Sequence, residues 1–61
     1  MNTREITFHM NNVGYVTTET RSNGDMTFKH KTKKRIVSLS SQEIVNITSH
    51  SDLLKLVITK L

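Results

Sequence analysis

The chain has 61 residues, no cysteine and a formal net charge of +4. A chain this short forms a single small domain, residues 1–61, with a thin core, and it has no disulfide or thiolate metal site to reinforce that core. Neither end contains an apolar run long enough for a signal peptide or a membrane span, so we expect a cytoplasmic protein.

Composition favours strands over long helices. Threonine is the commonest residue with nine copies, and alanine and proline are absent. Threonine, valine and isoleucine fit a pleated sheet better than a helix. The richness in lysine, asparagine and isoleucine, together with the lack of alanine and proline, also hints at a phage or mobile-element origin.

Three strands are predicted in the first half of the chain. Residues 5–10, EITFHM, alternate between apolar and polar side chains and predict the first strand. Residues 15–21 and 26–31 predict a second and a third strand, and the Asn-Gly pair between them is a strong hairpin signal.

The separation of apolar from polar side chains on the two faces of the strands indicates the register of the hairpin formed by residues 15–21 and 26–31. A three-residue loop, Ser22 to Gly24 with Gly24 left-handed, separates apolar from polar side chains better than a two-residue turn does. It pairs residues 20 with 26, 18 with 28 and 16 with 30. This register puts Val16 on the apolar face and Tyr15 on the polar face, opposite Lys31.

The second half of the chain contains the best helix signal. Residues 31–35, KTKKR, have no apolar side chain and must turn, after which residues 35–39 predict a strand. Ser40 and Glu43 fit a capping box, so we expect a short helix from Ser41 to Thr48, with a strand as the alternative. Residues 53–60 predict a closing strand.

The expected fold is therefore α+β: a small, mostly antiparallel sheet of about five strands, with one short helix before the C-terminal strand. The alternative is a small all-β barrel. The closing strand would be apolar on both sides, with Leu53 and Val57 on its reverse face. Such a strand lies at the centre of a sheet or in an interface, so we expect a homodimer with Leu53 or Val57 at the contact.

Most of the positive charge belongs to one segment. Residues 29–35 contain five of the nine Lys and Arg residues and no acid. These five cations suggest phosphate contacts, with the Tyr15 ring stacking on a base. The alternatives are a solvated hairpin that protects a sheet edge, or a surface for an acidic protein. The predicted binding residues are Tyr15, Lys29, Lys31, Lys33, Lys34 and Arg35.

Catalytic and metal sites are not expected. The sequence has no phosphate-binding glycine loop and no nucleophile motif, and its carboxylates are scattered. His9, His30 and His50 fall on different predicted elements without ligand spacing, so we expect surface histidines. The sequence predicts a small non-enzymatic regulatory module without cofactor that binds nucleic acid through residues 29–35.

The C-terminal third suggests a second function. SLSSQEIV followed by DLLKLVITKL resembles the end of the small phage inhibitors of uracil-DNA glycosylase. That resemblance implies a capped short helix, an apolar final strand and direct contact with a host protein. Those inhibitors are acidic DNA mimics, whereas this chain is basic. The alternative function is thus a phage or mobile-element protein that inhibits or redirects a host protein.

Overall fold

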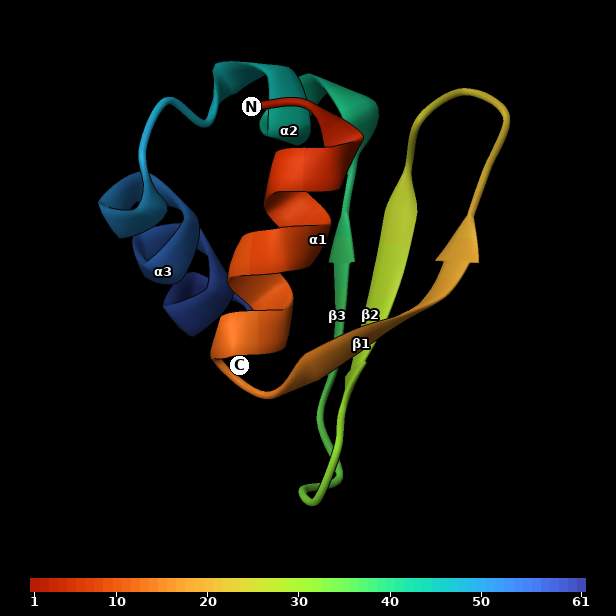
Figure 1. Ribbon diagram of the computed structural model, residues 1–61, viewed down its shortest axis with the longest axis vertical. Helices are drawn as coiled ribbons and strands as arrows, with labels where there is room; N and C mark the ends of the chain where they lie inside the picture. Colours follow the sequence, from red (N-terminus) through yellow and green to blue (C-terminus); the bar gives the residue numbers. More distant parts are fainter.

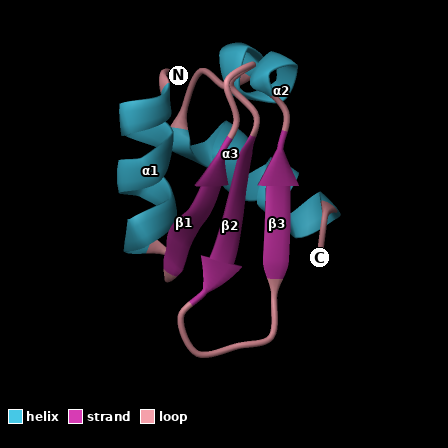
Figure 2. Ribbon diagram, turned by 90° about the vertical axis from the view of Figure 1, so that its right-hand side faces the viewer, coloured by secondary structure: helices cyan, strands magenta, loops and turns pink.

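A three-stranded antiparallel sheet forms one layer of the molecule, and three helices lie against one of its faces (Figures 1 and 2). The computed structural model describes all 61 residues. The elements are α1 (Thr3–Asn12), β1 (Tyr15–Thr20), β2 (Met26–His30), β3 (Ile36–Leu39), α2 (Ser41–Asn46) and α3 (His50–Thr59). The α+β class is confirmed. The five strands, the single helix and the all-β alternative are wrong.

The first predicted strand is instead helix α1. The Asn2 side chain accepts a hydrogen bond from the Glu5 amide, and the Glu5 carboxylate accepts one from the Asn2 amide, which completes a capping box. Ile6 and Met10, four residues apart, lie on the same helix face and are fully buried. Phe8 lies on another side of the helix and is 62% exposed.

The closing strand is also wrong, because residues 50–59 form α3. Ser49 caps this helix by accepting a hydrogen bond from the Asp52 amide. Leu53 and Val57 are again four residues apart, and both are buried in the core. They are therefore not available for the expected homodimer contact, because the two-sided apolar strand that motivated that contact does not form.

The β1–β2 turn is confirmed. The Gly24 amide donates to the Arg21 carbonyl, the Arg21 amide donates to the Asp25 carbonyl, and Gly24 has a φ of 97°. These bonds close a three-residue loop, Ser22 to Gly24, in which a positive φ favours glycine.

The rest of the predicted register is wrong because of a β-bulge. Residues 20 and 26 pair as expected, but the register shifts between residues 17 and 19, so that Thr17 pairs with Phe28 and Tyr15 with His30. A bulge of one residue exchanges the faces of every side chain beyond it. Tyr15 therefore faces the core, and Val16 lies on the open face of the sheet.

Helix α2 and strand β3 are found where the sequence placed them, although α2 ends at Asn46, two residues earlier than predicted. The Ser40 hydroxyl accepts from the Glu43 amide, and the Glu43 carboxylate accepts from the Ser40 amide. The N-terminal ammonium group of Met1 donates to the carbonyls of Ile44 and Ile47, which fastens the start of the chain to α2.

One apolar core lies between the sheet and the helices. Its buried side chains come from every element and from the α2–α3 connection: Ile6, Met10, Tyr15, Met26, Phe28, Val37, Leu39, Ile44, Ile47, Leu53 and Val57. The other face of the sheet has no covering layer (Figure 2). There Lys29 pairs across the strands with Val16 and with Ile36, which is 67% exposed.

Candidate functional site

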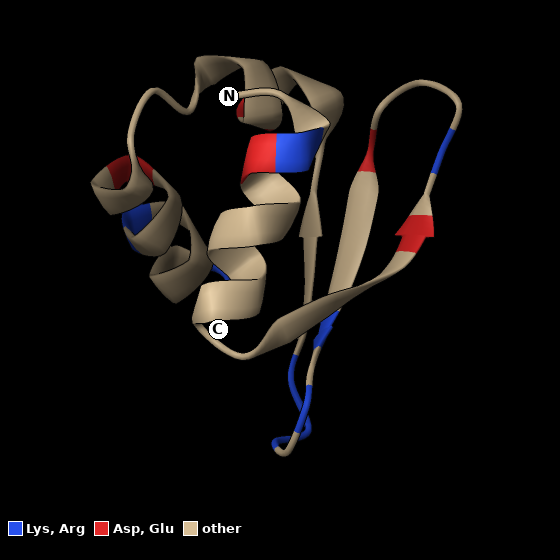
Figure 3. Ribbon diagram, in the orientation of Figure 1, with Lys and Arg blue, Asp and Glu red and all other residues tan.

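The basic segment forms one end of the sheet. We call residues 29–35 the basic hairpin: Lys29 and His30 end β2, and residues 31–35 form the loop that leads into β3. Its five cationic side chains are all exposed. Figure 3 shows the backbone of this segment, largely blue for Lys and Arg, at the end of the molecule that protrudes beyond the helices. The sequence-based expectation that this segment turns between two strands is confirmed.

None of these five cations forms an ion pair within the chain. The two ion pairs are Arg21 with Glu19, at 2.8 Å, and Lys60 with Glu43, at 3.0 Å. The remaining carboxylates cap or brace backbone amides away from the hairpin: Glu5 in α1, Asp25 at the start of α2 and Asp52 at the start of α3. The positive charge of the basic hairpin is therefore uncompensated within the chain.

The loop is held in shape by His30. Its Nδ1 atom accepts hydrogen bonds from the backbone amides of Thr32, at 3.2 Å, and Lys33, at 3.1 Å. An Nδ1 atom that accepts carries no proton, so the proton of the neutral ring resides on Nε2. This role of His30 could not be predicted from the sequence, because it depends on the conformation of the loop that the side chain caps.

Gly14 fastens the hairpin to the rest of the molecule. Its carbonyl accepts a hydrogen bond from the Lys31 amide at 2.9 Å. A Cβ atom on Gly14 would lie 2.8 Å from His30 Nε2, and the φ of Gly14 is 94°. Both facts favour glycine. The sequence indicated only that the first predicted strand ends before this position.

Tyr15 does not join the five cations as predicted. The residue is 3% exposed, and its ring meets the His30 ring edge-on with the centroids 5.0 Å apart. The register shift at the bulge is the reason. A base cannot stack on a ring face that packs in the core, so the site consists of Lys29, Lys31, Lys33, Lys34 and Arg35.

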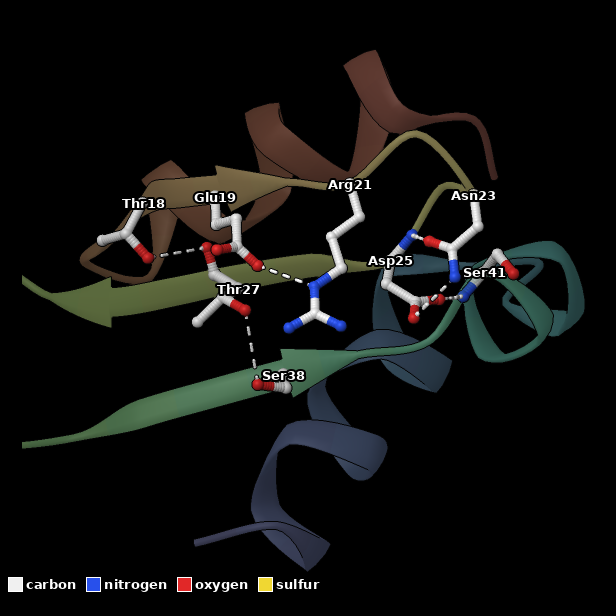
Figure 4. Close-up of polar contacts among 8 residues, drawn as sticks. All are labelled: Thr18, Glu19, Arg21, Asn23, Asp25, Thr27, Ser38 and Ser41. Carbon is white, nitrogen blue, oxygen red and sulfur yellow. Dashed lines mark hydrogen bonds and ion pairs between the residues drawn. The ribbon is translucent and has the colours of Figure 1, made fainter.

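The opposite end of the sheet is polar and carries charges of both signs, with Arg21 between Glu19 and Asp25 (Figure 4). The Arg21 side chain donates to Glu19, and this hydrogen bond raises the pKa of the guanidinium group above its usual range. Nearby, the Thr18 hydroxyl donates to the Thr27 carbonyl at 3.2 Å. The two ends of the sheet therefore differ: one carries a neutralised pair and the other carries free cations.

Comparisons with known protein families, with curated protein sequences and with solved structures found no match. No helix of this chain has both the length and the apolar character that crossing a bilayer requires. The geometry and charge of the basic hairpin are therefore the features of this chain that bear on function.

Proposed function

We propose that this chain is a small non-enzymatic module that binds nucleic acid through the basic hairpin. The observation that carries the proposal is the gathering of five exposed, unpaired cations on one protruding loop and strand end. Cations that are already paired gain little from meeting a phosphate, whereas free ones displace its condensed counterions.

The proposal favours duplexes over single strands. Proteins that bind single strands supply aromatic rings on which bases stack. Of the three aromatic residues, Tyr15 and Phe28 are buried, and only Phe8, on α1, is exposed. The basic hairpin thus offers charge without a stacking surface.

The salt dependence of binding tests this function. If three to five cations contact duplex phosphates, log K should fall with log salt concentration with a slope of about −2.7 to −4.5. Changing Lys31 and Lys33 to Gln should flatten that slope by up to about 2 units. Fluorescence anisotropy with labelled duplex and single-stranded oligonucleotides at three salt concentrations measures it.

A double variant of the same charge provides the control. Arg4 and Lys55 are exposed, form no ion pair and lie on α1 and α3, outside the hairpin. Changing both to Gln removes two positive charges and should leave the slope unchanged. Equal slopes for the two double variants would show that net charge, not the hairpin, governs binding. Failure of the wild-type chain to bind any oligonucleotide would contradict the proposal.

Direct contact with a host protein is the second candidate. It is supported by a shallow hollow beside the hairpin that combines cations with exposed apolar side chains. Its lining is Lys34, Arg35, Ile36, Lys60 and Leu61. Such a surface suits an acidic partner with an apolar anchor. Capture of a protein from lysate that persists after nuclease treatment and is lost in Ile36→Lys would favour this function over the first.

A further inference from the structure

Two histidines that are far apart in the sequence meet on the helical side of the molecule. His9 lies in the last turn of α1, and His50 is the first residue of α3. Their Nδ1 atoms are 3.0 Å apart, and their ring centroids are 4.7 Å apart. The sequence assigned these histidines to different elements, which the structure confirms, but their proximity was not predicted because helix α3 was not predicted.

The distance between the two nitrogen atoms suits a shared metal ion. Imidazole nitrogens bind divalent transition metals at about 2.1 Å. Two nitrogens 3.0 Å apart then subtend an angle of about 90° at the metal. This is the angle between neighbouring ligands in the octahedral and tetragonal geometries, which Ni²⁺ and Cu²⁺ favour over tetrahedral Zn²⁺.

We propose that His9 and His50 form a two-histidine site for a divalent transition-metal ion of the Ni²⁺ or Cu²⁺ type. No third His, Cys, Asp or Glu joins the pair, so water supplies the remaining ligands. Both side chains are only half-buried, which leaves solvent room to do so.

Binding requires a change of tautomer and a small ring rotation. In the metal-free pair one Nδ1–H donates to the other Nδ1. When both Nδ1 atoms bind the metal, the donor ring carries its proton on Nε2 instead, so two neutral rings release no proton overall. The two helix ends act in opposite senses, because the C-terminal turn of α1 favours a cation and the N-terminus of α3 disfavours it.

The bound ion would join α1 to α3 across 41 positions of sequence and should therefore stabilise the fold. Once the site is saturated, each tenfold rise in free Ni²⁺ should raise the Tm by about 5 to 11 °C for a domain of this size. Thermal melts of the untagged chain with NiCl₂, followed by circular dichroism, measure this shift. ZnCl₂ should give a smaller one.

The third histidine supplies a matched control. His9→Asn and His50→Asn should each abolish the Ni²⁺ shift, while His30→Asn should keep it. If a variant does not fold, the wild-type chain still decides the question by NMR. Substoichiometric Cu²⁺ should broaden the amide signals around residues 9 and 50. An absent Ni²⁺ shift in the wild type, a shift that His30→Asn removes, or broadening confined to other residues would overturn the proposal.

Discussion

At the scale of single residues, Tyr15 combines two features that oppose each other. Its ring adds apolar area to the core and packs edge-on against His30. Its hydroxyl group is buried and forms no hydrogen bond within the chain. A buried hydroxyl without a partner costs about 1–3 kcal/mol of desolvation.

Removing that hydroxyl should therefore stabilise the protein. Tyr15→Phe keeps the ring and deletes only the unpartnered atom, so the free energy of unfolding should rise by up to about 1–3 kcal/mol. Urea denaturation of both proteins measures the difference. Tyr15→Leu serves as the control, since it removes the ring as well and should destabilise the fold. A loss of stability in Tyr15→Phe would mean that the hydroxyl has a partner in solution.

At the scale of elements, two carboxylates hold the start of α2. Asp25 Oδ1 accepts from the Ser41 amide at 2.8 Å, and Glu43 Oε1 accepts from the Ser40 amide at 2.9 Å. These backbone hydrogen bonds lower the pKa of both carboxyl groups, with the Lys60 ammonium group adding to the effect at Glu43. Asp25 thereby joins the β1–β2 loop to the start of α2, and the ion pair of Glu43 with Lys60 joins the C-terminal end of α3 to α2.

The lowered pKa values predict a loss of stability in acid. In the unfolded chain, the side chains of Asp and Glu have ordinary pKa values of about 3.9 and 4.3, and below these values they are mostly protonated. The stabilisation is thus complete above those values and is lost as the pH falls through the lower pKa values of the folded state. Urea denaturation at pH 7 and at pH 3 should show it. Asp25→Asn with Glu43→Gln should be less stable at pH 7 and should vary less with pH; an unchanged pH dependence would contradict this account.

At the scale of the whole molecule, stability depends on a very small core. Only 11 of the 61 residues are buried, and a domain of this size rarely has more than about 3–5 kcal/mol of stability from its core. A single large cavity can remove most of that amount, since Leu→Ala in a core costs about 2–5 kcal/mol. The free energy of unfolding is therefore comparable to the contribution of a single core side chain.

Leu53→Ala should leave the chain largely unfolded at 25 °C, because Leu53 is fully buried. Far-ultraviolet circular dichroism measures the loss. Ile58→Ala, in the same helix at a position that is 68% exposed, is the control and should remain folded.

Homodimerisation itself remains a prediction. A folded Leu53→Ala protein that light scattering shows as a 7.0 kDa monomer, beside a wild-type dimer, would restore the interface role of Leu53.

Local signals predicted part of the fold. The Asn-Gly pair predicted the turn between β1 and β2, and the Ser40 capping box predicted α2 directly after β3. Helices α1 and α3 were missed although they have local caps of the same kind, at Asn2 with Glu5 and at Ser49 with Asp52. In α1 the apolar residues Ile6, Phe8 and Met10 also fit the period of a strand, and this alternation outweighed the cap.

Some features of the candidate site could likewise be predicted from the sequence, and others could not. The charge cluster and its turn could be read from residues 29–35, because both depend on neighbours in the chain. Three other features could not be predicted from the sequence: the burial of Tyr15, the loop contacts of His30, and the pairing of His9 with His50. The first depends on one inserted residue in β1, and the others depend on contacts of individual side chains.

The protruding basic hairpin also makes the molecule an electric dipole. Residues 29–35 carry five positive charges, and the remaining 54 residues carry four positive and five negative ones. The electric field of a polyanion would therefore orient the protein with its basic hairpin toward the polyanion before the two molecules come into contact. The association rate constant should then be high at low ionic strength and fall steeply with added salt, so that much of the salt sensitivity appears in the rate of encounter.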